Sequence, residues 1–285
     1  MNLEEAKRLK AHYEKMAIAG YIIGGVGFIL YLPVGASGGI GAALLMMGFF
    51  AGGFLLAGTA HARFKKISSS FKEKYMPSLI EKVLPGTQYY PESGFAWEDV
   101  ASMRFLKKSD RYHSEDYLIG TYKNIRFESA DCKLQDVHSN GKTTTVVTVF
   151  LGRVYRYEFP KNFPTELLLI QPGLGKKWGF GSYETIKTES IDFNKEFLTF
   201  ARDELKAFEM LLPQFMEKLL ELDRKYNDKI AVSFVGNTLN VAINNNIDTL
   251  EIRLFHPLDE TVFNEFESEI GDVKSLLDSL YGDKL

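Results

Sequence analysis

The chain has 285 residues, a formal net charge of −3 and a pI near 6.0. This charge balance argues against nucleic acid as a partner, because binding to phosphates relies on an excess of Lys and Arg. The single cysteine, Cys132, excludes an intramolecular disulfide framework and is typical of a reducing compartment. About 200 residues follow Glu81, which is enough for one sizeable hydrophobic core.

The 44 residues from Ala17 to Ala60 contain no Asp, Glu, Lys or Arg. A charged side chain at the centre of a bilayer costs roughly 2.5–3.5 kcal/mol on insertion scales, so a long uncharged apolar run indicates a membrane segment. Turn-forming residues from Pro33 to Gly39 interrupt the run near its middle. The sequence therefore predicts a transmembrane helical hairpin over residues 17–60, with spans at about 17–33 and 40–60.

Basic residues lie close to both ends of this hairpin and are absent from its loop. The positive-inside rule then places both termini in the cytoplasm, residues 1–16 included, and the loop outside. We therefore expect a cell-membrane protein with two spans. The basic residues are Lys7, Arg8, Lys10 and Lys15 before the first span, and Arg63, Lys65, Lys66, Lys72 and Lys74 after the second.

The first apolar run also has a competing interpretation as a cleaved signal peptide. Ala17–Leu32 is short for a span, and Val34–Ala36 supplies small residues before a cleavage point. The acidic residues Glu4, Glu5 and Glu14 before the run, and the second apolar run directly after it, favour the hairpin. Even after cleavage, the basic cluster would keep the C-terminal domain inside.

Half of the 24 glycines lie between residues 17 and 60. Gly20 and Gly24 form one small-xxx-small pair, and Gly48 and Gly52 form another. In lipid, such faces allow helix backbones to approach closely. We expect them to pack the two helices of the hairpin together, with association into a homo-oligomer as the alternative. A pore is least favoured, because few polar side chains lie near a path.

Residues 61–94 are predicted to form a juxtamembrane helical stalk and a linker. From Arg63 to Leu84, apolar residues recur every three or four positions, which is the spacing of one helix face. Pro77 is expected to bend or end this helix, and Pro85-Gly86 to stop it. Thr87–Gly94 is then the linker.

Residues 95–285 are predicted to form a cytoplasmic α+β domain, which begins with a short helix over Ala96–Leu106. Strand-forming residues follow, divided by turn signals. Asn140-Gly141 predicts a type I′ hairpin that joins Lys133–His138 to Thr143–Phe150. Further strands are expected at Val154–Phe159, Leu167–Gln171 and Thr185–Ile191.

Apolar residues at strict three-four spacing predict a long helix over Leu205–Tyr226, and Pro213 should kink or restart it. Packing against the core is favoured over a coiled coil. Strands followed by helices indicate an antiparallel sheet with two or more packing helices. The remaining elements are a hairpin of Ile230–Val235 and Thr238–Ile243, a strand at Leu250–Phe255 and a helix at Asp259–Tyr281.

Six short segments follow one another along the soluble part: Tyr117–Tyr122, Phe127–Asp131, Val149–Arg153, Glu189–Phe197, Leu211–Leu219 and Ile230–Phe234. With the hairpin, this ordered set resembles an uncharacterised bacterial family of two-span membrane proteins, a domain-of-unknown-function group sometimes labelled galanin-like. The resemblance implies a bacterial inner-membrane protein with a cytoplasmic domain. Members are often encoded near LemA-type membrane proteins, which points to such a protein as partner. The family has no established activity, so no catalytic roles carry over.

The sequence contains no recognisable catalytic or metal-binding pattern. Its five histidines lack ligand spacing and Cys132 has no cysteine companion, so we expect no metal and no cofactor. Cys132 is expected to be an inert thiol, although His138 or His256 could in principle activate it. Asp131 is expected to cap or turn the chain rather than to act as an acid or base. We therefore expect that the protein is not an enzyme.

The glycine-rich segment Gly173–Gly181 hints at a phosphate loop, but Ile170 and Lys177 occupy positions where that motif needs Gly and Ser or Thr. The segment is instead basic and aromatic, so it is a candidate for contact with lipid headgroups. An ordinary surface loop is the alternative. The candidate membrane-surface contacts are Arg63, Lys65, Lys66, Lys176, Lys177 and Trp178.

These observations favour a membrane-anchored cytoplasmic interaction module that binds a protein partner at the inner membrane. The alternative is a lipid-sensing PH-like domain, in which the helix Leu205–Tyr226 would cap a meander of strands. An enzyme acting on a lipid or small molecule ranks third. A cleft with converging titratable groups would favour the enzyme.

The predicted topology is tested with single cysteines in a chain whose Cys132 is replaced. A membrane-impermeant thiol reagent should label Ser37→Cys in intact cells, because the loop is expected outside. It should label Ser69→Cys only after permeabilisation. Labelling of Ser69→Cys in intact cells would contradict the cytoplasmic assignment.

Overall fold

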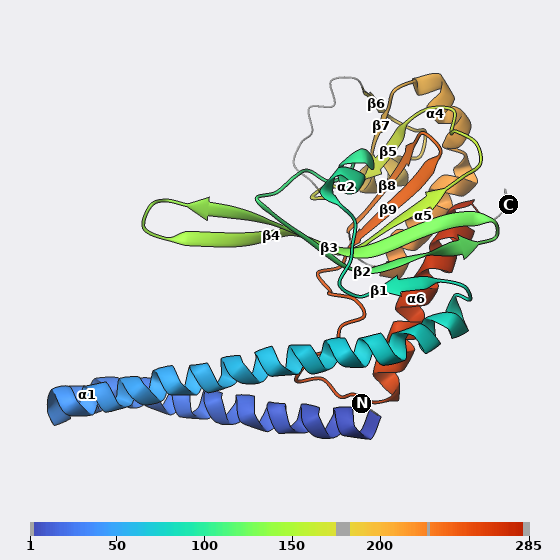
Figure 1. Cartoon of the computed structure of the whole chain (residues 1–285). Helices are drawn as coiled ribbons and strands as arrows, with labels where there is room; N and C mark the ends of the chain where they lie inside the picture. The colour runs from blue at the N-terminus through green and yellow to red at the C-terminus, as the bar shows by residue number, and fades with distance from the viewer. Residues whose placement is uncertain (1–2, 175–182, 227–228, 282–285) are drawn as a thin grey trace. The chain divides into compact units, whose positions relative to one another are not determined.

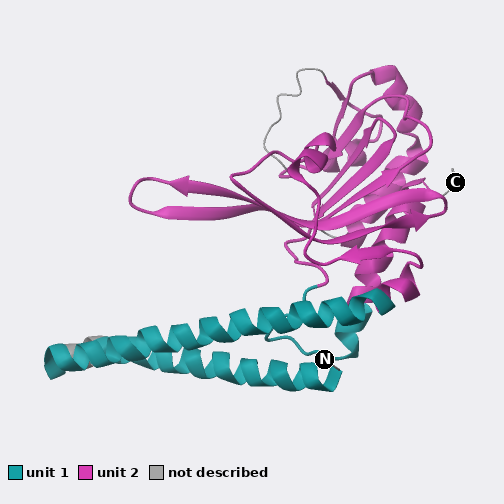
Figure 2. Ribbon diagram, in the orientation of Figure 1, with its two compact units in different colours: residues 1–78, 251–264 teal, residues 79–250, 265–285 magenta. Residues whose placement is uncertain are grey.

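A computed structural model of the chain describes residues 3–174, 183–226 and 229–281. The chain divides into two compact units (Figure 2). The first contains residues 1–78 and 251–264, and the second contains residues 79–250 and 265–285. Each unit has its own packing and is described separately.

The first unit is built on α1, which runs from Leu3 to Val83 and folds back on itself (Figure 1). Gly39 interrupts the helix with φ 72° and ψ −173°, a backbone conformation that favours glycine. Two helical segments result, Leu3–Tyr31 and Gly38–Val83, and both are long and apolar enough to cross a membrane. The orientation of the two segments in a membrane stays a prediction.

The second arm of α1 continues through Pro77 to Val83. The predicted end of the helix at Pro77 is therefore wrong, whereas the alternative, a bend at Pro77, stays a prediction. Proline removes only one backbone donor, and Phe71 and Met76 on this stretch are both buried, so packing keeps the helix intact.

Glycines allow the two arms of α1 to approach at backbone distance. A Cβ added to Gly20 would lie 2.6 Å from the carbonyl oxygen of Gly53, and one added to Gly53 would lie 2.2 Å from the amide nitrogen of Gly24. Such distances leave no room for a side chain. By contrast, a Cβ at Gly48 or Gly52 would meet nothing within 4 Å among the described residues. The arms thus meet through Gly20, Gly24 and Gly53, whereas Gly48 and Gly52 lie outside this contact.

Residues 251–264 pack on the ends of α1 within the first unit. Lys10 donates to the carbonyl oxygen of Leu254 at 2.6 Å, and Lys72 pairs with Glu251 at 2.7 Å. Both lysines are buried, so they do not face solvent as the neighbouring basic residues do. The predicted strand at Leu250–Phe255 is wrong: Leu250 has φ 55°, which a strand does not accept, and the segment is irregular.

The described residues of the second unit form a nine-stranded antiparallel sheet in the order β1-β2-β3-β4-β9-β8-β5-β7-β6. This confirms the predicted α+β class. The strands are β1 Gln88–Tyr90, β2 Arg111–Tyr122, β3 Ile125–Ser139, β4 Thr144–Glu158, β5 Leu167–Ile170, β6 Glu184–Ile186, β7 Leu198–Ala201, β8 Lys229–Val235 and β9 Thr238–Asn244. The helices are α2 Trp97–Ser102, α3 Ile191–Glu196, α4 Glu204–Met210, α5 Pro213–Tyr226 and α6 Glu260–Tyr281.

Several predicted boundaries change in the second unit. The expected linker Thr87–Gly94 contains β1, which pairs with β2. The strand expected to end at Ile191 ends at Ile186, because the side chain of Ser190 accepts from the amide of Phe193 and starts α3. Pro213 restarts the helix as predicted, between α4 and α5.

Both faces of the sheet are covered (Figure 1). On one face lie α2 and the residues after it, over Cys132 and Leu134 of β3. On the other face lie α5 and α6, and the Tyr157 hydroxyl of β4 donates to the carbonyl oxygen of Val273 at 2.8 Å. Because side chains alternate along a strand, Asp131 and Arg153 face the α6 side.

The glycine contact of α1 gives a matched pair of substitutions. Gly53→Ala should lower the thermal stability of the full-length chain in detergent, because its methyl group would overlap the backbone of the facing arm. Gly52→Ala should leave stability unchanged or raise it, since alanine is favoured in helices by about 1 kcal/mol. Heating followed by size-exclusion chromatography measures the difference. Equal melting of both variants would rule out the close approach.

Candidate functional site

A buried arginine organises the sheet of the second unit. Arg153 of β4 is 2% exposed, and its guanidinium donates to four oxygens. Nη1 contacts the Asp131 carboxylate at 3.1 Å and the Thr249 hydroxyl at 3.0 Å. Nη2 contacts the carbonyl oxygen of Asp116 at 2.7 Å, and Nε lies 3.4 Å from the Ser129 hydroxyl. A buried charge needs such partners, because desolvation alone costs several kcal/mol.

Asp116 reaches this arginine through an irregularity in β2. The register with β3 shifts between Glu115 and Leu118, and Asp116 has φ 57°. Its amide donates to the carbonyl oxygen of Pro91 at 3.0 Å, and its carboxylate accepts from the Tyr89 hydroxyl. Burial and the nearby Asp116 carboxylate raise the pKa of Tyr89, so the phenol stays protonated.

The Asp131 carboxylate is fully enclosed in this cluster. Both of its oxygens accept from the Thr249 hydroxyl, at 2.5 and 2.6 Å. Burial raises the pKa of Asp131 to about 7, although the positive charge of Arg153 opposes the shift. The prediction that Asp131 caps or turns the chain is wrong: it lies inside β3, directly opposite Arg153.

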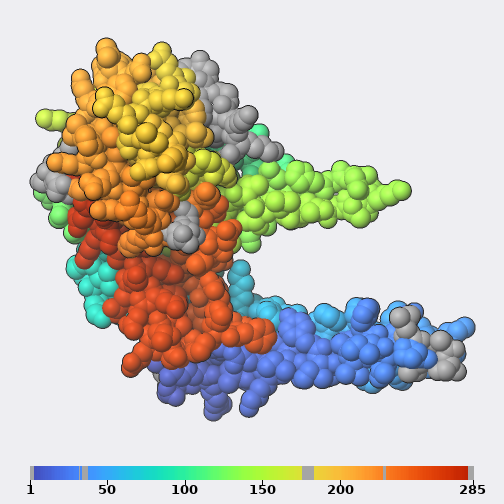
Figure 3. Space-filling view, turned by 180° about the vertical axis from the view of Figure 1, so that it is seen from behind, coloured from blue at the N-terminus to red at the C-terminus, as the bar shows by residue number. Residues whose placement is uncertain are grey.

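Beyond this cluster, β3 and β4 leave the sheet together. The pairing of β3 with β2 ends at Gln135, and that of β4 with β9 ends at Arg153. Residues 136–149, here called the ribbon, project from the sheet (Figure 3). Val146, Val147 and Val149 are 36–43% exposed on it.

The turn of the ribbon confirms the predicted hairpin but not its turn type. Gly141 has φ 81°, whereas Asn140 is not among the residues with positive φ, as a type I′ turn would require. Instead, the Asn140 side-chain oxygen accepts from the amides of Lys142 and Thr143 at 3.0 and 2.8 Å. The asparagine side chain therefore closes a longer loop.

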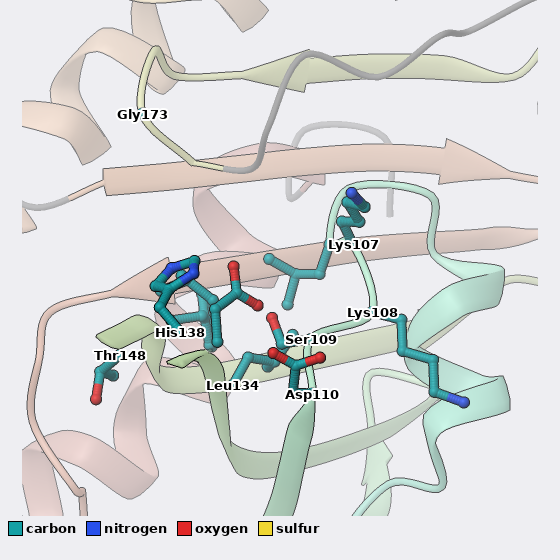
Figure 4. A pocket seen from close by; sticks show the side chains of 12 residues that line it. Lys107, Lys108, Ser109, Asp110, Leu134, His138, Thr148 and Gly173 are labelled. Carbon is teal, nitrogen blue, oxygen red and sulfur yellow. The ribbon is translucent and has the colours of Figure 1, made fainter. Parts of the chain in front are cut away.

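A cleft of about 490 Å³ lies at the root of the ribbon (Figure 4). Lys107 and Lys108 lie on the side of the cleft opposite His138 and Thr148. The Asp110 carboxylate accepts from the amide of Val137 at 2.7 Å, which ties the loop after α2 to β3. The cleft thus carries charges of both signs, but its two lysines and its histidine do not converge on one position.

A second hollow, of about 250 Å³, lies beside α4 and α5 and is mainly apolar. Leu212 of its lining is 41% exposed, and Leu205 and Phe208 of α4 are 80% and 41% exposed. The sequence predicted that the whole apolar row of this helix packs into the core. That is correct for Leu219 and Leu222 and wrong for the α4 half, because the chain breaks before Pro213 and α4 takes its own course. The hollow is lined by Phe163, Pro164, Glu209, Met210, Leu212, Gln214, Phe215, Lys218, Phe234, Leu280 and Tyr281.

The candidate membrane contacts fall into two groups. Arg63, Lys65 and Lys66 are exposed on α1 of the first unit. Lys176, Lys177 and Trp178 lie outside the described residues, as does most of the glycine-rich segment.

Cys132 is buried under α2, where its sulfur lies 3.5 Å from the Ser114 hydroxyl and 3.6 Å from that of Tyr112. Burial raises the pKa of the Cys132 thiol to about 11, which disfavours the reactive thiolate. Over residues 3–174, 183–226 and 229–281, no group of three or more His, Cys, Asp or Glu side chains is placed to hold a metal ion.

Comparisons with known proteins agree with part of the sequence resemblance. Residues 148–281 match a family model described as "Protein of unknown function (DUF3137)". No curated protein matches the chain. Among solved structures, the crystal structure of the mycobacterial trehalose monomycolate transport factor A, TtfA, is similar with a TM-score of 0.38 and 10% identity, covering 71% of this chain and 92% of that one. The matched family region runs from β4 to the end of α6 and has no assigned activity.

The buried cluster predicts a large difference between two ion pairs. Asp131→Ala should lower the free energy of unfolding by about 3–5 kcal/mol, because it leaves the Arg153 charge buried without its carboxylate. Lys195→Ala removes the exposed pair with Asp192 and should cost less than about 1 kcal/mol. Urea unfolding of the full-length chain in mild detergent, monitored by tryptophan fluorescence, measures the loss of stability in each variant. Similar losses in both variants would show that the cluster contributes little.

Proposed function

We propose that this protein is a membrane-anchored, non-enzymatic cytoplasmic module that binds a protein partner through the apolar surface of α4 and α5. The observation that carries the proposal is the exposure of three large apolar side chains, Leu205, Phe208 and Leu212, of which Leu212 also lines the hollow with Phe215 and Phe234. Large apolar side chains that gather at a concave surface mark protein interfaces more often than scattered single ones do.

The free energy gained by burying these apolar side chains is large enough to support a protein partner. Burying one Leu or Phe side chain contributes about 1.5–3 kcal/mol, so three such residues can account for a large part of a micromolar affinity. The hollow can receive an apolar side chain of the partner at the centre of the interface, where binding energy concentrates. Glu209, Gln214 and Lys218 at the hollow supply a polar rim.

The helical hairpin supports the membrane part of the proposal. Two helices of sufficient length and apolarity precede the soluble unit, and the exposed Arg63, Lys65 and Lys66 follow the second apolar stretch. Anchoring confines the module to a surface, which raises its effective concentration toward a partner in the same bilayer. The sequence resemblance makes a LemA-type membrane protein the first partner to test.

A role at the lipid surface is the second candidate function. The exposed Arg63, Lys65 and Lys66 favour it, since each basic residue near an anionic leaflet contributes about 1 kcal/mol. The strand order offers less support, because β4-β9-β8-β5 is not the meander expected of a PH-like domain.

The interface is tested by co-purification of the full-length chain with a LemA-type protein in mild detergent. Leu205→Glu and Phe208→Glu should each lower recovery of the partner at least tenfold, which corresponds to about 1.4 kcal/mol of lost binding. Tyr90→Glu is the matched control: it also places a carboxylate at an exposed apolar residue, but in β1 at the other end of the strand order.

The possible results test the binding surface and the interaction role separately. Equal recovery with Leu205→Glu and the parent chain would show that the partner binds elsewhere. Failure to recover any stoichiometric partner with the parent chain, across several growth conditions, would remove the interaction role.

A further inference from the structure

The ribbon has two edges that differ in protection. On β3, Asp110 accepts from the Val137 amide at 2.7 Å, and Asp136 and His138 add polar side chains. On β4, no described strand pairs with the outer edge before Arg153. Unprotected edges are uncommon, because proteins usually block them with charges, proline or a covering loop.

The sequence of this edge is unusually suited to strand pairing. Every residue from Thr144 to Val149 is β-branched, and none of them is charged, proline or glycine. The valines lie partly exposed on the ribbon. A two-stranded ribbon is marginally stable in water, so additional strands would stabilise it.

The backbone hydrogen bonds determine which amide and carbonyl groups of β4 face its outer edge. The Val137 amide donates to Asp110 and therefore points away from β4, and Val137 lies opposite Val146. Val137 and Val146 therefore form a non-hydrogen-bonded pair. In an antiparallel ladder, both residues of such a pair direct their amide and carbonyl groups away from each other, toward the outer edges. By alternation, Thr144, Val146 and Thr148 present their backbone groups to the outer edge of β4.

We propose that this edge binds the same edge of a second copy of the chain, antiparallel and around a two-fold axis at Val146. In this register, Val146 lies opposite Val146 of the second copy, and Thr144 lies opposite Thr148. The three outward-facing residues of each strand then satisfy one another. The uncharged edge brings no like charges together, whereas Asp136 on the β3 edge would.

Symmetry favours a second copy of the chain over an unrelated strand. A two-fold contact uses one surface twice, and this strand is complementary to itself in both hydrogen bonds and side chains. The proposal does not depend on the partner surface at α4 and α5, since the two surfaces share no residue.

Cysteine cross-linking in the full-length chain tests the register. Val146→Cys places two Cα atoms about 5.5 Å apart across the axis, within the range for a disulfide. Thr148→Cys is the control, because its counterpart lies four residues along the strand, at about 14 Å. We expect at least tenfold more cross-linked dimer from Val146→Cys under mild oxidation. The parent chain, with Cys132 buried, gives the background.

A charged residue at the two-fold axis tests dimer formation independently of cross-linking. Val146→Lys should convert the dimer to a monomer in detergent, as seen by light scattering, while Val137→Lys on the β3 edge should remain dimeric. Unchanged thermal melting of both variants shows that they fold. A monomeric parent chain, a dimer that survives Val146→Lys, or cross-linking of Val146→Cys to a different protein would each overturn the proposal.

Discussion

The pairing of Arg153 with Asp131 is the interaction on which the second unit depends. A guanidinium that is 2% exposed can stay charged in the interior only while its donors are matched by acceptors. Those acceptors come from β2, β3 and the segment after β9, so one side chain fixes the relative positions of distant parts of the chain. Arg153 also marks the point where β4 leaves β9, which makes the cluster the base from which the ribbon projects.

Local signals in the sequence were sufficient for much of the fold. The Asn140-Gly141 pair marks a hairpin because turn chemistry lies within a few residues, and Pro213 restarts a helix for the same reason. Asp131 could not be placed in this way. Its partner Thr249 is 118 residues away, and no periodicity in the sequence records a contact over that separation.

Periodicity also identifies an apolar face without saying what covers it. The row from Leu205 to Leu222 has one spacing throughout, yet its first half is exposed and its second half is buried. The glycines of the hairpin show the same limit: Gly20 and Gly24 lie in the contact, whereas Gly48 and Gly52 share their spacing but lie outside it. Spacing defines a face of a helix, and only the packed structure decides which face is used.

The two proposed surfaces can act together because they use different residues. A dimer formed through β4 would present two copies of the apolar surface on α4 and α5. If a partner also carries two binding segments, the second contact forms at the effective concentration set by the first, and avidity exceeds the affinity of a single site. A modest apolar hollow would then be sufficient for stable assembly. In this arrangement the ribbon determines how many binding surfaces are held together, and the hollow determines what they bind.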